Sequence, residues 1–449
     1  MKRPLAIIAT IFMSLQLWAQ NEMPSILPMR ERAAIIDQWL EERMEQVLPD
    51  LMSREKIDMW IIIAREYNED PVIETMLPAT WLSARRRTIL LLYDQGEDKG
   101  VERLAVARYN VGKSFTKSWE KEQQPEQWDR LVELIEQRDP QRIAVNRSDH
   151  FALADGISAT EYQKFMEVLP QQYKDRVVSG ENLAVGWLET RTVNEMEVYK
   201  DICAIAHRII AEGFSSNVIK SGETTTDDLV WWYRDRIREL GLTAWFHPSV
   251  SIQRADPESF DHLRSFSERP EHQVISPGDL LHLDFGITYL KLNTDTQQHA
   301  YVLKSGEIDA PEYLKKALAD GNKLQDIFTN EFKEGRTGNE ILASAIEQAI
   351  KQGLKPTIYT HPIGYHGHGA GPTIGLWDQQ EGVPGRGDYR LYYNTAYSIE
   401  LNNATYIPDW KKEIRIMLEE DAFFDKTGVQ YIDGRQTVLH LISSTNKVD

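Results

Sequence analysis

Apolar and polar residues alternate with helical periodicity over residues 31–56, where apolar side chains recur every three or four positions among charged ones. Short apolar runs that are typical of strands follow at 59–64, 88–93, 104–107 and 143–145. Helical periodicity returns near 125–137 and 159–169. Strands that alternate with helices predict an α/β domain, which we place at residues 20–185.

The pattern changes near residue 184. Helices are predicted over 192–217, 224–241, 311–330 and 338–353. Strand-like segments lie at 247–253, 280–289, 297–303, 396–402 and 413–424. A loop rich in glycine and histidine, 360–375, precedes the last two strands. This part of the chain is expected to form a second domain, and no internal repeat is visible in its sequence.

Strand parity separates acidic residues of these segments from apolar ones. Residues 281, 283, 285 and 287 are apolar, so Asp284 lies on the opposite face. Glu400 is likewise on a polar face, and Glu419 shares a face with other charged residues, whereas Glu420 has the parity of apolar neighbours. For any single one of these strands, a sheet with one solvated face is the simpler explanation.

Four acids taken together favour a metal centre. Asp284, Asp295, Glu400 and Glu419 occupy strand or strand-end positions, and the histidine-rich loop lies between the two pairs. Carboxylates aimed at one cavity repel each other, and two divalent cations ~3.5–4 Å apart would relieve that repulsion. Carboxylate oxygens with one imidazole suit Mn²⁺, Co²⁺, Zn²⁺ or Fe²⁺ better than Mg²⁺ or Ca²⁺.

The order of these residues resembles the ligand motifs of the methionine aminopeptidase, Xaa-Pro aminopeptidase and creatinase superfamily. The string Leu-Leu-His-Leu-Asp-Phe-Gly at 280–286, with a second Asp eleven residues after the first, resembles its first two ligands. Residues 361–368 match its H-x-x-G-x-x-x-H element, and 398–400 and 418–424 resemble the last two ligand elements. The resemblance implies the metal ligands Asp284, Asp295, His361, Glu400 and Glu419, with Glu420 as the alternative to Glu419.

The resemblance covers residues 190–445 and implies an α+β catalytic domain of the "pita-bread" fold. An N-terminal α/β domain of this size favours the prolidase and Xaa-Pro aminopeptidase branch, because methionine aminopeptidases lack it. The implied function is hydrolysis of an N-terminal Xaa-Pro peptide bond by a bridging water that two metal ions activate, with Mn²⁺ as the expected metal. Cleavage of Xaa-Pro dipeptides is the alternative.

Three residues are expected to do the chemistry that this resemblance implies. His368 would hydrogen-bond the developing oxyanion, Glu400 would shuttle a proton, and His366 would help to place the peptide substrate. A creatinase-like hydrolase without metals is a rival, but the complete ligand set argues against it. A non-catalytic binding protein is another, and intact His361 and His368 argue against it.

The sequence departs from the family pattern at two places. The family usually follows its second Asp with x-Thr-Arg-Thr, whereas Asp295 is followed by Thr-Gln-Gln-His at 296–299. The missing Arg is expected to alter ligand support or substrate contacts. The family's substrate-binding His upstream of the first Asp has no clear counterpart. His262 and His272 are candidates, although each is more simply an ordinary loop histidine.

Composition narrows the class of protein further. The 449 residues carry 51 basic and 69 acidic side chains, a formal charge of −18, which argues against nucleic-acid binding. The negative field suits a substrate with an N-terminal amine. The single cysteine, Cys203, excludes an internal disulfide framework and a multi-cysteine metal site. We expect the enzyme to be a homodimer.

The N-terminus has the pattern of a secretory signal peptide. Lys2 and Arg3 precede an apolar run over 4–17, and a small residue, Ala19, ends a plausible cleavage site. The run is shorter than the ~20 residues of a membrane span, so an uncleaved anchor helix is the weaker alternative. We therefore expect residues 1–19 to be removed and the protein to be exported, periplasmic or secreted, and free of the membrane.

Overall fold

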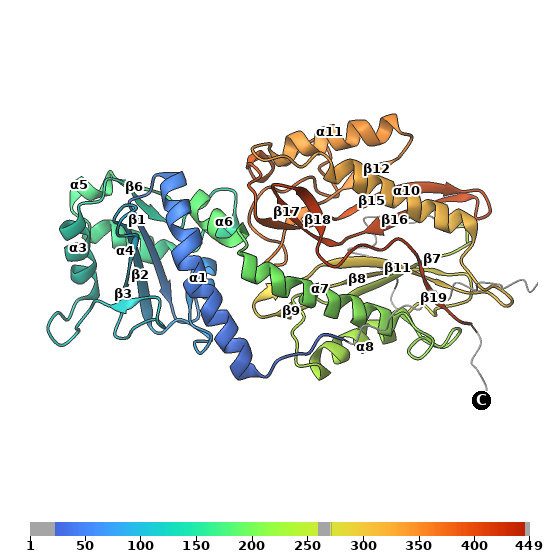
Figure 1. Ribbon diagram of the computed structural model, residues 1–449, viewed down its shortest axis with the longest axis horizontal. Helices are drawn as coiled ribbons and strands as arrows, with labels where there is room; N and C mark the ends of the chain where they lie inside the picture. The colour runs from blue at the N-terminus through green and yellow to red at the C-terminus, as the bar shows by residue number, and fades with distance from the viewer. Residues whose placement is uncertain (1–22, 259–269, 271, 445–449) are drawn as a thin grey trace, which may run out of the picture.

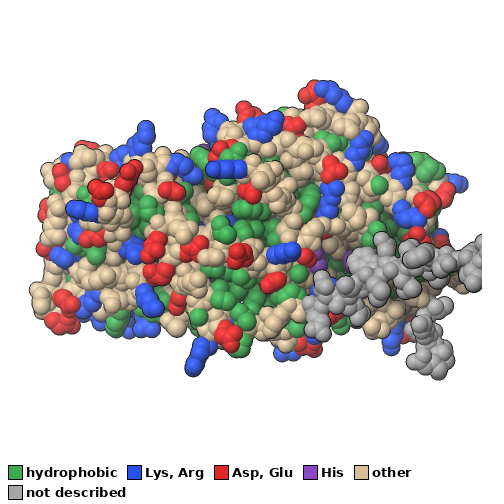
Figure 2. All heavy atoms as spheres, in the orientation of Figure 1, with side chains coloured by type: hydrophobic (Ala, Val, Ile, Leu, Met, Phe, Trp, Pro, Cys, Tyr) green, Lys and Arg blue, Asp and Glu red, His purple; other side chains and the backbone are tan. Residues whose placement is uncertain are grey.

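The computed structural model describes residues 23–258, 270 and 272–444. It consists of two units that lie side by side in Figure 1. On the face seen in Figure 2, acidic and basic side chains are interspersed over both units. The predicted signal peptide, residues 1–19, lies outside the described residues. Within the described ranges, no helix is long and apolar enough to cross a membrane.

The smaller unit is built on a mixed six-stranded sheet of order β4-β3-β2-β1-β5-β6. Its central strand β1 pairs antiparallel with β2 and parallel with β5, so hairpin and crossover connections meet in one sheet. The strands are β1 (Met59–Arg65), β2 (Arg87–Asp94), β3 (Val101–Val106), β4 (Thr116–Lys117), β5 (Ile143–Val145) and β6 (Val177–Ser179).

Helices cover both faces of this sheet, as Figure 1 shows, and β1 is therefore a continuous apolar run. Trp60 and Ile62 pack in the core that contains α1 and α6, whereas Met59 and Ile61 pack with α3 and α4. The alternation of strands and helices predicts this arrangement. The helices are α1 (Met29–Glu55), α2 (Pro71–Met76), α3 (Gln127–Arg138), η1 (Ala152–Ala154), α4 (Ala159–Val168), α5 (Gln171–Lys174) and α6 (Glu181–Glu189).

The larger unit holds its strands between two pairs of helices (Figure 1). The sheet β19-β11-β8-β7 packs on α7 and α8, and the sheet β12-β15-β16 packs on α10 and α11. A third sheet has the order β13-β14-β17-β18, and β9 and β10 form a short hairpin. The helices are α7 (Val193–Gly213), α8 (Thr226–Glu239), α10 (Glu312–Thr329), α11 (Gly338–Lys351) and η2 (Arg386–Asp388).

The two halves of the larger unit share one order of elements, two helices followed by antiparallel strands. The first half runs α7, α8, β7, β8, β11 and the second runs α10, α11, β12, β15, β16. No repeat is visible in the sequence, so the halves share an arrangement without an evident common motif. The strands are β7 (Ser249–Gln253), β8 (Leu280–Phe285), β9 (Thr288–Tyr289), β10 (Leu292–Asn293), β11 (Thr296–Val302), β12 (Pro356–Ile358), β13 (His361–Pro362), β14 (Thr395–Ser398), β15 (Leu401–Ile407), β16 (Lys412–Leu418), β17 (Asp421–Asp425), β18 (Gly428–Tyr431) and β19 (His440–Ile442).

Two segments predicted as single strands are each broken in the structure. The chain leaves β14 at Ser398 and enters β15 at Leu401, and it leaves β16 at Leu418 and enters β17 at Asp421. The pairs β14–β17 and β15–β16 belong to different sheets, so both segments change sheets at these points. Parity cannot be followed through such a break, because the side-chain alternation restarts in the new sheet.

A buried ion pair joins the two units. The Arg43 guanidinium of α1 lies 3.1 Å from a carboxylate oxygen of Glu195 in α7, and neither side chain is exposed to solvent. Arg43 also donates to the carbonyls of Trp187 and Thr190. Glu195 additionally completes a capping box with Thr192 at the start of α7, so one carboxylate serves both the helix end and the contact between units.

We predict that Arg43→Met destabilises the protein by about 3 kcal/mol, because it leaves the Glu195 carboxylate buried with one cation fewer. Urea unfolding of the metal-loaded protein would measure the change. Arg238→Met is the matched control, since the Arg238 side chain is 83% exposed, and it should leave the unfolding midpoint unchanged. Equal midpoints for the two variants would contradict the structural role of this pair.

Candidate metal centre

Strand register and strand breaks place the candidate ligands. Asp284 is the penultimate residue of β8 and Asp295 directly precedes β11, and the β8–β11 pairing aligns Phe285 with Thr296. Glu400 and Glu419 sit in the two breaks where the chain changes sheets. His361 begins β13 and pairs with Ser398, beside the first break. Residues far apart in sequence therefore meet where three sheets come together.

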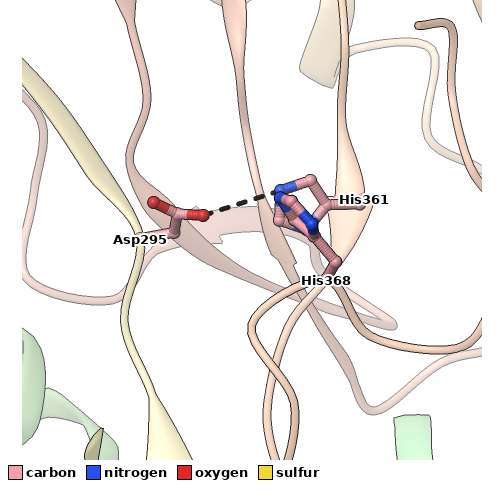
Figure 3. A group of neighbouring side chains, drawn as sticks. All are labelled: Asp295, His361 and His368. Atoms are coloured by element: carbon pink, nitrogen blue, oxygen red, sulfur yellow. Dashed lines mark ion pairs between the residues drawn. The ribbon is translucent and has the colours of Figure 1, made fainter. Parts of the chain in front are cut away.

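The structure brings all five predicted ligands into one cluster. Three sets of ligand atoms each lie within 4.8 Å of one another, namely Asp284–Asp295–Glu419, His361–Glu400–Glu419 and Asp295–His361–His368. Figure 3 shows the third set, in which the Asp295 carboxylate is directed at the His361 ring and His368 lies beside it. Because Glu419 belongs to the first two sets, its carboxylate is placed between two neighbouring groups of ligands.

Two buried polar atoms of the cluster have no hydrogen-bond partner among the described residues. They are Oδ1 of Asp295 and Nε2 of His361. The His361 ring donates from Nδ1 to the carbonyl of Pro362 at 3.1 Å, so its Nε2 lone pair faces the carboxylates. That Nε2 lies 3.7 Å from Asp295 Oδ2 and 3.6 Å from Glu419 Oε1. An acceptor facing acceptors is costly unless a cation lies between them, so these residues fit a divalent metal ion.

The electrostatics of the cluster lead to the same conclusion. Burial, and then repulsion from Glu419 and Asp284, raise the pKa of Asp295 well above its usual range. The same two causes raise the pKa of Glu400, and burial raises that of Glu419 to about 7. Burial lowers the pKa of His361 to about 4, so the imidazole is neutral. Without a cation, the cluster retains protons on its carboxyl groups at neutral pH.

The two further histidines of the loop lie in different surroundings. His368 is on the exposed side of the cluster, with its ring 4.7 Å from that of His361 and 5.3 Å from that of Trp245. His366 does not join the ligand sets, and within the described part of the chain its buried Nδ1 has no hydrogen-bond partner. Burial and then the positive charge of Arg191 lower its pKa to about 4.

Glu420, His262 and His272 are the alternative site residues that the sequence leaves open. Glu420 points away from the cluster and contacts His207 at 2.8 Å, so the geometry favours Glu419. Strand parity alone does not distinguish the two residues, because Glu419 and Glu420 lie in the break between β16 and β17. His262 lies outside the described residues. Nδ1 of His272 lies 3.6 Å from a carboxylate oxygen of Asp227 in α8.

Three residues around the cluster were not predicted. Gln297 donates hydrogen bonds to both Glu400 and Glu419. Its departure from the x-Thr-Arg-Thr pattern was the one sign in the sequence that this position differs from the family. The ring of Tyr359 lies 5.5 Å from that of His361. Trp245 contacts His368 and belongs to an aromatic pair with Phe246, but neither its position nor its spacing in the sequence indicated the site.

A carboxylate–imidazole cluster between the two helix-backed sheets defines an α+β metal-dependent hydrolase of the pita-bread fold. The model of metallopeptidase family M24 matches residues 197–430, just over half of the chain. The chain belongs to this family, and it is a hydrolytic peptidase of a family that uses divalent metals. No curated protein sequence matches the chain.

Solved structures share the fold over nearly their whole length. X-Pro aminopeptidase from Thermotoga maritima aligns with a TM-score of 0.60 and 18% identity over 87% of this chain and 99% of that one. Xaa-Pro dipeptidase from Bacillus anthracis aligns with a TM-score of 0.56 and 16% identity over 92% and 100%. Prolidase from Pyrococcus furiosus has a TM-score of 0.54 and 16% identity over 87% and 100%. These similarities include the N-terminal unit.

We predict that the affinity for Mn²⁺ falls as the pH is lowered below about 7. A carboxyl group must lose its proton to bind a cation, and the pKa of Glu419 in the metal-free fold is about 7. His361, with a pKa of about 4, stays neutral over this range and does not compete. Calorimetric titrations in buffers of different ionisation enthalpy should detect more protons released at pH 6 than at pH 8. Equal proton release at the two pH values would contradict the prediction.

Proposed function

We propose that this enzyme is a dinuclear-metal peptidase that hydrolyses the N-terminal Xaa-Pro bond of peptides. The observation that carries the proposal is the pair of overlapping ligand sets, Asp284–Asp295–Glu419 and His361–Glu400–Glu419, which share one carboxylate. Membership of family M24 and the similarity in fold to Xaa-Pro aminopeptidases and prolidases support it. The mixture of oxygen and imidazole donors favours Mn²⁺, with Co²⁺, Zn²⁺ or Fe²⁺ as alternatives.

When bound, two divalent cations would supply Lewis acidity and a water of lowered pKa. Glu400 would accept a proton from the attacking water and pass it to the leaving amine. Its carboxyl group belongs to the second ligand set, and an amide hydrogen bond from Gln297 holds it at 2.8 Å. Burial, followed by repulsion from Glu419 and Asp284, raises the pKa of Glu400, and a more basic carboxylate is a better proton acceptor.

His368 would stabilise the oxyanion that develops on the scissile carbonyl. Burial, followed by the influence of His361, lowers its pKa to about 4, so the ring is neutral at pH 7 and can donate one N–H hydrogen bond. Its position on the exposed side of the cluster leaves room for a peptide. His366, deeper in the loop with a free buried Nδ1, would help to place the substrate.

The site offers an aromatic surface for the proline of the substrate and an acidic group for its N-terminal amine. Trp245 and Phe246 form an aromatic pair with ring centroids 4.4 Å apart, and Trp245 continues to His368. These rings offer a surface on which a proline ring could pack. Asp284, like Glu400, is a half-buried carboxylate of the cluster, and we assign it a role in attracting the substrate's amino group as well as a metal ion.

We predict that Xaa-Pro peptides are cleaved in the presence of Mn²⁺, and that chelation abolishes the activity. Asp295→Asn should remove both metal binding and activity, because this buried carboxylate is a proposed ligand and its Oδ1 has no hydrogen-bond partner among the described residues. His368→Ala should lower kcat by about 10²–10³-fold with little change in Mn²⁺ affinity, since it loses an oxyanion donor and no proposed ligand. Steady-state kinetics and metal titration would measure both.

Asp235→Asn is the matched control, because the Asp235 side chain is 68% exposed on α8 and should leave both quantities unchanged. Full activity in Asp295→Asn or after complete metal removal would refute the mechanism. A dipeptide, a tripeptide and an Xaa-Ala analogue would be compared. Cleavage of the dipeptide alone would identify an Xaa-Pro dipeptidase, and equal cleavage of Xaa-Ala would exclude proline specificity.

We also propose that the enzyme is exported and acts as a homodimer. The charged start, short apolar run and Ala19 site of the sequence support export with cleavage after Ala19. Mass spectrometry of the native protein should then find Gln20 at its N-terminus, in the periplasmic or extracellular fraction. Light scattering after size-exclusion chromatography should give twice the mass of the mature chain. Retention of Met1, or a monomeric mass, would contradict the respective proposal.

A further inference from the structure

Gln297 of β11 lies at the centre of the hydrogen bonds that support the cluster. Its side-chain Nε2 donates to Glu400 Oε1 at 2.8 Å and to Glu419 Oε2 at 2.7 Å. Its Oε1 accepts a hydrogen bond from His282 Nε2 at 2.9 Å. The residue is 5% exposed, so water does not compete for these partners. Both carboxylates come from the strand breaks, more than a hundred positions away.

The backbone of Gln297 also forms hydrogen bonds with Glu419, in the break between β16 and β17. Its N–H donates to the carbonyl of Glu419 at 2.9 Å, and the N–H of Glu419 donates back at 3.3 Å. This two-way pairing is an isolated bridge between β11 and the end of β16. The side chain and the main chain of one residue therefore fix the position of Glu419 relative to Glu400.

The chemistry of an amide suits this place better than that of a cation. Lys or Arg would also donate to two carboxylates, but their charge would neutralise the acids and oppose the entry of a metal ion. An amide satisfies one lone pair on each carboxylate and leaves the negative charge in place. His282 restrains the amide from rotating, because its N–H requires the oxygen to point toward it.

We propose that Gln297 is a positioning residue that sets the separation of Glu400 and Glu419 for two divalent cations. It acts through these carboxylates and does not itself bind metal. His282 orients its amide. The inference rests on the proposed function of the cluster as a dinuclear metal centre. The family pattern has threonine at position 297, where this chain has glutamine.

The test is metal binding by the purified full-length enzyme. Gln297→Met keeps the size of the side chain and removes both amide donors, and it should weaken Mn²⁺ binding by about 10–100-fold in a calorimetric titration. It should also change the visible absorption spectrum of the Co²⁺-loaded protein, which reports the geometry of the ligands. Gln297→Asn, whose amide is one carbon shorter and cannot span both carboxylates, should act in the same direction and serves if the Met variant does not fold.

Gln253→Met is the matched control. Gln253 is also buried, on the neighbouring strand β7, but it donates to the carbonyl of Arg415 outside the cluster. It should cost stability without changing Mn²⁺ affinity or the Co²⁺ spectrum. His282→Phe should weaken Mn²⁺ binding by less than Gln297→Met, and the double variant should be no weaker than Gln297→Met alone, because His282 acts through Gln297.

Wild-type Mn²⁺ affinity and an unchanged Co²⁺ spectrum in a folded Gln297 variant would overturn the inference and leave the proposed function intact. Equal losses in Gln297→Met and Gln253→Met would also overturn it, since the effect would then be general to buried glutamines. A wild-type enzyme that binds neither Mn²⁺ nor Co²⁺ would instead overturn the proposed function, and the inference with it.

Discussion

Repulsion among buried carboxylates is the constraint on which the rest of the larger unit depends. Asp295 and Glu419 are 3% and 1% exposed, and Glu419 shares one ligand set with Asp295 and another with Glu400. Such a group is tolerated only when hydrogen bonds and a counter-charge compensate it. The two helix-backed cores on either side supply the rigidity that keeps the acids together, and the strand breaks free their side chains from the sheets.

The N-terminal unit supports the loop that carries the histidines of the site. Tyr365 lies in the histidine loop, and its hydroxyl donates to Glu195 at 2.8 Å. The guanidinium groups of Arg43 and Arg191 lie over its ring, 5.1 Å and 4.6 Å from the centroid. Arg43 belongs to α1, so a helix of the first third of the chain helps to hold the loop that carries His361 and His368. The ion pair between the units therefore supports the site as well as the fold.

The sequence was informative where the signal is local. Continuous apolar runs located β1 and β5, helical periodicity located α3 and α7, and motif order located five ligands that the structure places together. The strand breaks were not predictable, because the change of sheet at Glu400 and Glu419 is decided by packing between distant segments. Tyr359 and Trp245 reach the site through tertiary contacts and carry no spacing signal. The repeated order of elements is likewise invisible in the sequence, since only the arrangement recurs.

The family's arginine would stand at position 298, and the side of β11 on which this residue lies explains why glutamine can replace it. Position 298 points away from the metal cluster, where Gln298 donates to Glu420 at 2.9 Å. Burial alone would lower the pKa of His207, but the carboxylates of Glu420 and Asp433 outweigh it and raise that pKa to about 10. The imidazolium of His207 thus supplies the positive charge that a guanidinium at 298 would bring to Glu420. Gln297 therefore supports Glu419 on the face of β11 that carries the proposed metals, and Gln298 supports Glu420 on the opposite face. The positive charge of His207 lies on that opposite face, away from the metals.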